Sequence, residues 1–305
     1  MKNLAILLAV LGWLTSASAH AETALPRLDI AALAASETQL FVGSFDQGLW
    51  IVGRDGKARR FEDRGLSPHI NALAWSEREQ VLWLGTARGL SRCKPSGGCA
   101  RLGPSSAVHA VLLRHDGSLV AGGDAGLTFV DGRSAESVGK KQGAPYRSVW
   151  ALGEHADGTL FVGATNGLFW GDAASVRAGK AKLQRASIVT GALPDDWVTA
   201  LLVQGDTVHV GTYNAGLVSF RAEGGRLTPE SADDSLGYVN PAGVVATGDG
   251  ALAIATMDGL RSGMPGDTNL NETQARDITA IVPAWQGGYW VGTRQGLEWI
   301  RLSAV

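Results

Sequence analysis

Cysteine, proline and charge are all scarce in this chain of 305 residues. There are only 2 Cys and 10 Pro, and charged residues make up 18% of the total, with a formal net charge of −2. A low and nearly balanced charge argues against a nucleic-acid binder, a polybasic membrane-surface protein and a disordered charged tail. We therefore expect a folded chain with no nucleic-acid partner, and 45% hydrophobic residues can build its core.

Long apolar runs are also absent, except at the N-terminus, where Leu4–Leu14 follows the single basic residue Lys2. This run has the length of a signal-peptide apolar region, whereas the alternative, a membrane anchor, would need ~20 residues. The small-x-small sequence Ala17-Ser18-Ala19 follows it. We predict a signal peptide over residues 1–21, a mature domain over residues 22–305 in the bacterial periplasm or secreted, and no transmembrane segment after cleavage.

The two cysteines, Cys93 and Cys99, are separated by Lys-Pro-Ser-Gly-Gly. In an oxidising compartment an even pair with turn residues between them predicts a disulfide across a hairpin. The alternative, a metal or redox site, lacks further Cys or His nearby, because zinc needs four ligands.

Glycine, by contrast, is abundant, with 41 residues and no collagen-like period, which is typical of a chain with many tight turns. A pattern ending in Gly-Leu recurs, as in Trp83–Leu90 and Trp290–Leu297. Its seven copies carry a small marker residue at steps of 37 to 48 residues: Gly43, Gly85, Gly122, Gly163, Gly211, Ala255 and Gly292. Seven copies at this spacing indicate a repeat protein with one supersecondary unit per copy.

A short apolar segment with the pattern (I/V)-x-A-L precedes most markers. Clear examples are Ile70–Leu73 and Val198–Leu201, and the sixth copy is degraded to Gly243–Ala246. Asp-Gly pairs such as Asp116-Gly117 lie between segment and marker and indicate hairpin turns. Read instead as calcium ligands, these pairs would lack the alternating acidic residues of a calcium loop.

A third strand is expected after each Gly-Leu pair, and a more polar fourth strand after that. Four strands in about 40 residues are typical of one β-propeller blade. The sequence thus predicts an all-β fold, a seven-bladed β-propeller of four-stranded blades. The amphipathic helices of a TIM barrel are missing, and a β-sandwich would not repeat at this period. We expect each marker glycine to end the second strand, where the chain turns without room for a Cβ atom.

The seventh copy has three expected strands, which leaves its outer edge open. We predict that the N-terminal strand closes the ring, with Thr23–Leu28 pairing with Leu297–Leu302 as the fourth strand of the last blade. Pro26 is compatible with that place, because an outermost strand pairs on one side only.

The combined pattern, (I/V)-x-A-L followed after about ten residues by L-W-(V/L)-G-T-x-x-G-L, resembles the two-component regulator propeller repeat over about residues 28–300. Trp83–Leu90 and Trp290–Leu297 carry the resemblance most clearly. It implies a propeller of the kind found in the periplasmic ligand-sensing parts of hybrid histidine kinases, where the ligand is often a glycan. We expect neither the kinase nor the immunoglobulin-like spacer of that family here, so sensing would require a separate kinase as partner.

Catalytic motifs of serine hydrolases, zinc proteases and P-loop enzymes are missing, and the 6 His are scattered. We expect no catalytic residue, no cofactor and no metal site. His115 and His155 are expected to be solvated beside hairpins, and His109 and His209 to be structural. Similar-looking propeller lyases and lactonases use acids or His with a metal near the axis, whereas the inner segments here carry Ala, Val and Leu.

In a propeller, the loops before the inner strands and the turns between the second and third strands share one face around the central opening. In this chain those positions carry aromatic, basic, acidic and amide side chains, which suit a polar, glycan-like or peptide-like ligand. The residues predicted to bind it are His69, Arg88, Arg147, Trp197, Tyr213, Tyr238, Asn240, Asp277 and Arg294. Trp197 and Tyr238 are the strongest of the set, because large aromatic residues are less expected in polar loops.

The sequence therefore predicts an exported, monomeric, non-catalytic recognition or scaffold propeller that binds a ligand or a protein partner around its central opening. Two alternatives stay open: a ligand-sensing partner of a separate two-component kinase, and a propeller lyase or lactonase.

Overall fold

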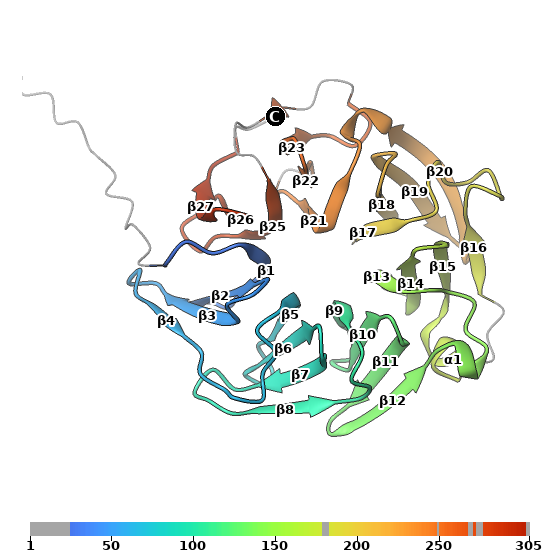
Figure 1. Cartoon of the computed structure of the whole chain (residues 1–305). Coiled ribbons are helices and arrows are strands. Elements are labelled where there is room, and N and C mark those ends of the chain that lie inside the picture. Colours follow the sequence, from blue (N-terminus) through green and yellow to red (C-terminus); the bar gives the residue numbers. More distant parts are fainter. Residues whose placement is uncertain (1–24, 179–182, 249, 268–270, 273–276, 303–305) are drawn as a thin grey trace, which may run out of the picture.

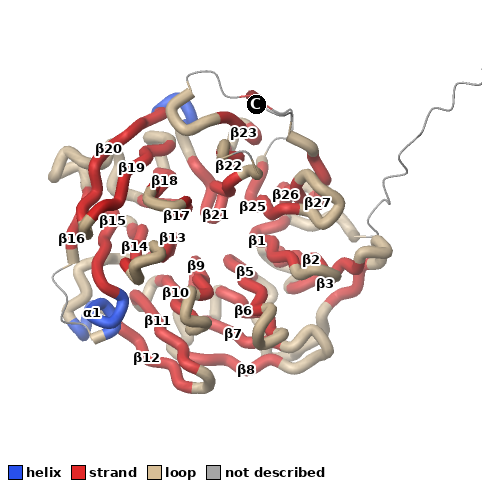
Figure 2. The backbone as a smooth tube through the Cα atoms, turned by 180° about the vertical axis from the view of Figure 1, so that it is seen from behind, coloured by secondary structure: helices blue, strands red, loops and turns tan. Residues whose placement is uncertain are grey.

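The computed structural model describes residues 25–178, 183–248, 250–267, 271–272 and 277–302, which form a ring of seven antiparallel sheets (Figure 1). The sheets stand around a central axis, as the view from behind also shows (Figure 2). The predicted seven-bladed all-β propeller is confirmed. The predicted signal peptide lies outside the described residues.

Each blade begins with an inner strand beside the axis. The inner strands are β1 (Ile30–Ala35), β5 (Ile70–Ser76), β9 (Val108–Leu113), β13 (Val149–Glu154), β17 (Val198–Gln204), β21 (Val239–Ala246) and β25 (Ile278–Pro283). The second strands are β2 (Gln39–Ser44), β6 (Val81–Thr86), β10 (Leu119–Gly123), β14 (Thr159–Ala164), β18 (Thr207–Thr212), β22 (Leu252–Thr256) and β26 (Tyr289–Thr293).

The remaining strands complete the blades toward the rim. The third strands are β3 (Leu49–Gly53), β7 (Gly89–Cys93), β11 (Gly126–Asp131), β15 (Gly167–Asp172), β19 (Leu217–Glu223), β23 (Gly259–Gly263) and β27 (Gly296–Ile300). The outer strands are β4 (Ala58–Arg60), β8 (Cys99–Leu102), β12 (Ser134–Val138), β16 (Gln184–Ala186), β20 (Arg226–Asp233) and β24 (Asn271–Glu272). Short helical segments occur in connections: α1 (Ala173–Arg177), η1 (Lys140–Gln142) and η2 (Asp234–Leu236).

The marker glycines lie within the second strands, where they provide contact between blades rather than the turn that we expected. A Cβ atom on Gly163 would lie 2.5 Å from Cγ1 of Val198, the first residue of the next inner strand. The same relation holds at each of the six glycines and ends with Gly292, whose Cβ would lie 2.5 Å from Cγ2 of Ile30. A β-branched residue of each following blade thus packs against bare backbone, and this contact also joins the last blade to the first.

Residue x of the (I/V)-x-A-L pattern forms a β-bulge in the inner strand. In the first blade Ile30 pairs with Ser44 and Ala32 with Gly43, so Ala31 is the extra residue. A bulge turns its extra side chain out of the regular alternation of the strand. Residue x of each repeat can therefore face the axis or the next blade instead of its own sheet.

The sixth inner strand departs from this regularity. Val239 pairs with Thr256, and the next pair is Val244 with Ile254, so four residues, 240–243, bulge from the strand. The strand therefore begins at Val239 and not at Gly243, as the degraded repeat predicted. The longer bulge places Asn240 and Pro241 at the axial cavity described below.

The predicted disulfide is present between Cys93 and Cys99, whose Cα atoms lie 4.2 Å apart. The two residues are direct partners in the β7–β8 pair, so the bridge joins the third and outer strands of one blade. The backbone N–H of Cys99 donates a hydrogen bond to the carboxylate of Asp63 in the preceding loop (2.9 Å).

The predicted ring closure by an N-terminal strand is not confirmed. In the described part of the chain β27 pairs only with β26, and residues 25–29 form no strand. Leu25 and Leu28 instead pack in one apolar cluster with Leu297 and Trp299 of β27. Residues 22–24 lie outside the described residues, so the strand pairing stays a prediction.

Candidate functional site

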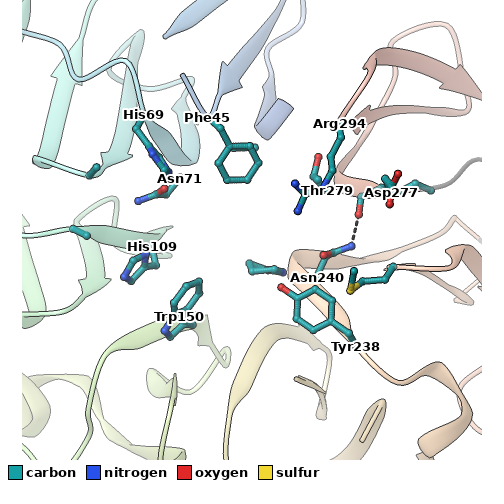
Figure 3. Close-up of a pocket in the computed structure, with 16 residues that line it drawn as sticks. Phe45, His69, Asn71, His109, Trp150, Tyr238, Asn240, Asp277, Thr279 and Arg294 are labelled. Carbon is teal, nitrogen blue, oxygen red and sulfur yellow. Dashed lines mark hydrogen bonds between the residues drawn. The ribbon is translucent and has the colours of Figure 1, made fainter. Parts of the chain in front are cut away.

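A cavity of about 430 Å³ lies at the axis and opens on the upper face, which carries the loops before the inner strands and the turns between second and third strands. His69, His109 and Trp150 approach it from one side, and Tyr238, Asn240 and Arg294 from the other (Figure 3). A narrower cavity of about 120 Å³ continues below it along the inner strands. The residues lining both cavities are Ala31, Asn71, His109, Trp150 and Pro241.

A chain of five rings runs beside the cavity, and we call it the aromatic arc: His109, Trp150, Trp197, Tyr213 and Tyr238. His109, Trp150 and Tyr238 line the cavity, and Trp197 and Tyr213 lie between them. His109 stacks in parallel on Trp150, with ring centroids 4.2 Å apart. Trp197 meets Trp150 edge to face at 5.5 Å and stacks on Tyr213 at 4.3 Å. Tyr213 meets Tyr238 edge to face at 5.1 Å. Each ring therefore holds its neighbour in place, and the arc spans blades 3 to 6 as a preorganised apolar surface.

Two asparagine side chains offer hydrogen-bond acceptors to the cavity. The amide nitrogen of Asn71 donates to the carbonyl oxygen of Val108 (2.9 Å), and that of Asn240 donates to the carbonyl oxygen of Ile278. Both recipients are first residues of the next inner strand. One N–H of each amide is thus occupied between blades, and each amide oxygen is an acceptor that a ligand can use.

Charges of both signs meet at the junction of blades 7 and 1. Arg294 Nη1 lies 4.0 Å from Asp29 Oδ2, and Asp277 lines the cavity next to Arg294. Burial raises the pKa of Asp29, Arg294 acts against that rise, and the carboxylates of Asp46 and Asp277 add to it. Two further carboxylates thus lie near the Asp29–Arg294 pair, which leaves this side of the cavity without excess positive charge.

His109 is held from both sides. Its Nε2 lies 3.1 Å from Oδ1 of Asp124, and the hydroxyl of Ser148 donates to the same oxygen at 2.6 Å. Burial acts to raise the pKa of Asp124, but the hydrogen bonds from Ser148 and His109 outweigh it and lower that pKa. His109 therefore lines the cavity in a fixed orientation, which corrects the expectation of a purely structural residue.

Five of the nine residues predicted to bind a ligand line the cavity: His69, Tyr238, Asn240, Asp277 and Arg294. Trp197 and Tyr213 support this set as the middle of the aromatic arc. Arg88 and Arg147 do not line the cavity. Ala87 lines it in place of Arg88, whereas neither Arg147 nor the next residue, Ser148, is among the lining residues.

Sequence reasoning missed several lining residues. The bulge position x holds five of them, namely Ala31, Asn71, His109, Trp150 and Thr279. The pattern itself therefore contained the signal, because its only variable position is the one that turns toward the axis. Phe45 and Met257, in turns between second and third strands, also line the cavity.

Chemically, the site combines an apolar wall, amide and carboxylate acceptors, and imidazole and guanidinium donors. Among the described residues no group of three or more His, Cys, Asp or Glu is arranged to hold a metal ion. No helix within the described ranges is long and apolar enough to cross a membrane.

Solved structures of low sequence identity share this fold. The extracellular domain of the hybrid two-component system BT4673 from B. thetaiotaomicron aligns with a TM-score of 0.73 and 19% identity over 92% of this chain and 39% of that chain. The corresponding domain of BT3049 from the same organism gives 0.72 and 16% over 89% of this chain and 39% of that one. The WD40 propeller domain of Doa1 gives 0.69 and 13% over 89% and 93%.

These likenesses show the fold, and extracellular domains of two-component systems are thus among the structures with the architecture that the repeat resemblance implies. This chain spans 39% of the length of the two sensor structures. No family model matches the chain, and no curated protein does either.

Proposed function

We propose that this chain is an exported recognition propeller that binds a neutral, hydroxyl-rich ligand of the sugar class in the axial cavity without transforming it. The observation that carries the proposal is the pairing of the aromatic arc with the acceptor oxygens of Asn71 and Asn240 across one cavity. Its volume of about 430 Å³ falls in the range of small-molecule sites.

A sugar ring matches this arrangement because it presents C–H faces and hydroxyl edges together. The C–H faces would pack on Trp150 and Tyr238, whose rings are fixed by their neighbours. Hydroxyl groups would donate to the amide oxygens and to Asp277, and would accept from Arg294. An anionic ligand is disfavoured there, because Arg294 already faces Asp29 and the carboxylates of Asp46 and Asp277 lie nearby, so an uncharged sugar fits better than a sugar acid.

The fold likeness supports a sensing role as the second candidate function. The extracellular domains of BT4673 and BT3049 belong to two-component systems, and they share this propeller at low identity. In that case the bound ligand would be reported to a kinase in a separate chain. The proposed ligand class is the same whether or not the chain has such a sensing role.

Calorimetric titration of the mature chain with neutral mono- and disaccharides tests the proposal. We expect Trp150→Ala to weaken binding of any saccharide that binds by up to about tenfold, because ring stacking contributes about 0.5–1.5 kcal/mol beyond buried area. A matched control is Trp285→Ala, which removes a half-buried Trp in the β25–β26 hairpin, away from the cavity.

A second variant tests the site independently in case Trp150→Ala does not fold. We expect His69→Ala, at a half-buried lining residue, to weaken binding of the same saccharide while the melting temperature stays unchanged. Equal affinity of Trp150→Ala, His69→Ala and the unmodified chain would contradict the proposed site, and the absence of saccharide binding across the panel would contradict the ligand class.

A further inference from the structure

Exposed large apolar side chains gather on the upper face over blades 5 and 6. Ile188 is 53% exposed, Val189 87%, Tyr213 40% and Met257 57%. These four residues, which we call the upper ledge, follow β16 or lie in the turns after β18 and β22, so all belong to the upper face. One further large apolar residue of the described chain is comparably exposed, Met264, and it follows β23 on the opposite face.

The turn that displays Ile188 and Val189 is held by a dense set of hydrogen bonds. Ser187 N–H donates to the hydroxyl of Thr190 (2.9 Å), and that hydroxyl donates to the Ser187 carbonyl (2.9 Å). Gly191 N–H donates to the carbonyl of Ile188 (2.9 Å), and Ile188 N–H donates to Asp196 (2.7 Å). The turn therefore holds two β-branched apolar side chains toward water at a cost in free energy.

The same turn is tied to the aromatic arc. Asp195 accepts hydrogen bonds from the backbone N–H groups of Trp197 (3.1 Å) and Asn214 (2.8 Å). Asn214 follows Tyr213, whose ring stacks on Trp197. Ile188 and Tyr213 are thus held within one hydrogen-bonded unit, and Met257 lines the axial cavity in the next blade.

A border of acidic residues surrounds the ledge: Asp195, Asp196, Asp233, Asp234 and Asp258. None of the five forms an ion pair within the described part of the chain, and the carboxylates of Asp195, Asp196 and Asp233 accept only from backbone N–H groups and the Ser235 hydroxyl. The upper loops and turns of these two blades contain no Lys or Arg, namely residues 187–197, 213–216, 233–238 and 257–258.

The upper loops of the earlier blades differ in charge. They carry both signs, with Arg64, Arg88, Lys140, Lys141 and Arg147 beside Asp46, Glu62, Asp63 and Asp124. The combination of exposed apolar side chains with uncompensated acidic charge is therefore confined to blades 5 and 6. Apolar patches bordered by polar groups are typical of protein interaction sites, and electrostatic complementarity selects the partner.

We propose that the upper ledge docks a basic, apolar segment of a partner protein, such as an amphipathic helix with Leu or Ile on one face and Lys or Arg beside it. Apolar side chains of the segment cover Ile188, Val189 and Tyr213, and its basic groups lie against the five aspartates. The inference does not depend on the ligand of the axial cavity. Met257 belongs both to the upper ledge and to the lining of the axial cavity, so a docked segment also lies at the rim of that cavity.

The probe is a synthetic helical peptide of about 18 residues with leucine on one face and lysine on the other. Binding of the labelled peptide to the full mature chain is followed by fluorescence anisotropy at low and high salt. We expect a saturable complex that weakens as salt rises. The double substitution Ile188→Ser with Val189→Ser should weaken it by about tenfold or more, and Asp234→Asn with Asp258→Asn by a smaller factor.

Three controls make the result decisive. Met264→Ser removes an apolar residue that is 43% exposed on the opposite face, and it should leave the affinity unchanged. A peptide with Glu in place of Lys, and one with Ser in place of Leu, should both bind at least about tenfold more weakly. The proposal is overturned if the Leu/Lys peptide does not bind below about 1 mM. Equal binding of either control peptide overturns it as well, and so does an Ile188/Val189 variant that binds like the unmodified chain.

Discussion

Blades 5, 6, 7 and 1 are joined near the axis by neutral hydrogen bonds, whereas blades 3, 4 and 5 are joined by ion pairs at the lower face, which carries the hairpins between first and second strands. In the first region the hydroxyl of Thr199 donates to the Val239 carbonyl (2.6 Å), and that of Thr279 donates to the Ile30 carbonyl (2.5 Å). In the second, Arg114 Nη2 lies 2.7 Å from Glu154 Oε1, and His155 Nε2 lies 3.2 Å from Asp206 Oδ1.

The two regions differ because the bulge residue x of the inner strand makes different contacts in them. The bulge residue bonds to the next blade where it is Asn71, Thr199, Asn240 or Thr279. In blades 3 and 4 the bulge residue is His109 or Trp150, which stack on each other at the cavity instead. The lower-face ion pairs join the same two interfaces, 3–4 and 4–5. Where the bulge side chains line the cavity at one end of these blades, ionic contacts join the blades at the other end.

The largest effect is expected from breaking the lower-face contact between blades 3 and 4. Glu154 is only 4% exposed and accepts from Arg114 Nε and Nη2 and from the His115 backbone N–H. Glu154→Ala should lower the free energy of unfolding by about 3 kcal/mol, because Arg114 would stay largely buried with only the exposed carboxylate of Asp116 as an ionic partner, and the His115 N–H would lose its acceptor. Urea denaturation measures the loss.

The matched control is Glu230→Ala, which breaks the more exposed Arg221–Glu230 pair on blade 5 and should cost less than about 1 kcal/mol. Equal losses for Glu154→Ala and Glu230→Ala would show that the lower-face pair does not carry the 3–4 interface.

A smaller effect is expected from breaking a neutral bond in the other region. Thr199 is fully buried, and its hydroxyl donates across the 5–6 interface. Thr199→Val keeps the shape of the side chain and should lower the free energy of unfolding by about 1–2 kcal/mol, because the Val239 carbonyl loses its donor. Since neither group titrates, denaturation at pH 5 and pH 8 should give the same loss. If the loss in free energy of unfolding differed between pH 5 and pH 8, the contact between blades 5 and 6 would not be neutral, and the two regions would not differ in the way described.

Much of this arrangement follows from the repeat. The Gly-Leu pairs and the (I/V)-x-A-L segments predict the blades, because one β-branched residue and one glycine per repeat form the contact between neighbours. The long bulge at Asn240 could not be predicted, because a degraded repeat does not show which residues leave the strand. Arg88 and Arg147 do not line the axial cavity, and the sequence could not show this, because an uncertainty of one residue in a strand boundary changes which way a side chain points.

The lower-face contacts were beyond sequence reasoning for a different reason. His155 was expected to be solvated, yet its side chain is only 13% exposed. It lies between Asp157 of its own hairpin and Asp206, which follows 51 residues later. No local pattern links two hairpins of neighbouring blades, because their approach depends on the curvature of the whole ring.

The smallest effect, and the one that separates ionic from neutral contacts most directly, concerns pH. Hydrogen bonding to Asp157 and Asp206 raises the pKa of His155 above its usual 6.5, and the bond from His155 lowers the pKa of Asp157 from 3.8 to about 2. The His155 contribution is fully present below pH 6.5 and is lost as pH rises through the higher pKa of the folded state. The Asp157 contribution is present above pH 3.8 and is lost as pH falls toward 2.

The free energy of unfolding of the unmodified chain minus that of His155→Gln should therefore be largest between about pH 4 and pH 6.5, at about 1 kcal/mol or less. It should shrink on both sides of that window. Urea titrations at pH 3, 5 and 9 measure it, and Thr279→Val serves as a neutral reference whose loss stays constant. A His155→Gln difference that does not decline from pH 5 to pH 9 would mean that the imidazole joins blades 4 and 5 by packing rather than by charge. The contact between blades 4 and 5 would then not be ionic, and the proposed difference between the two regions would be wrong there.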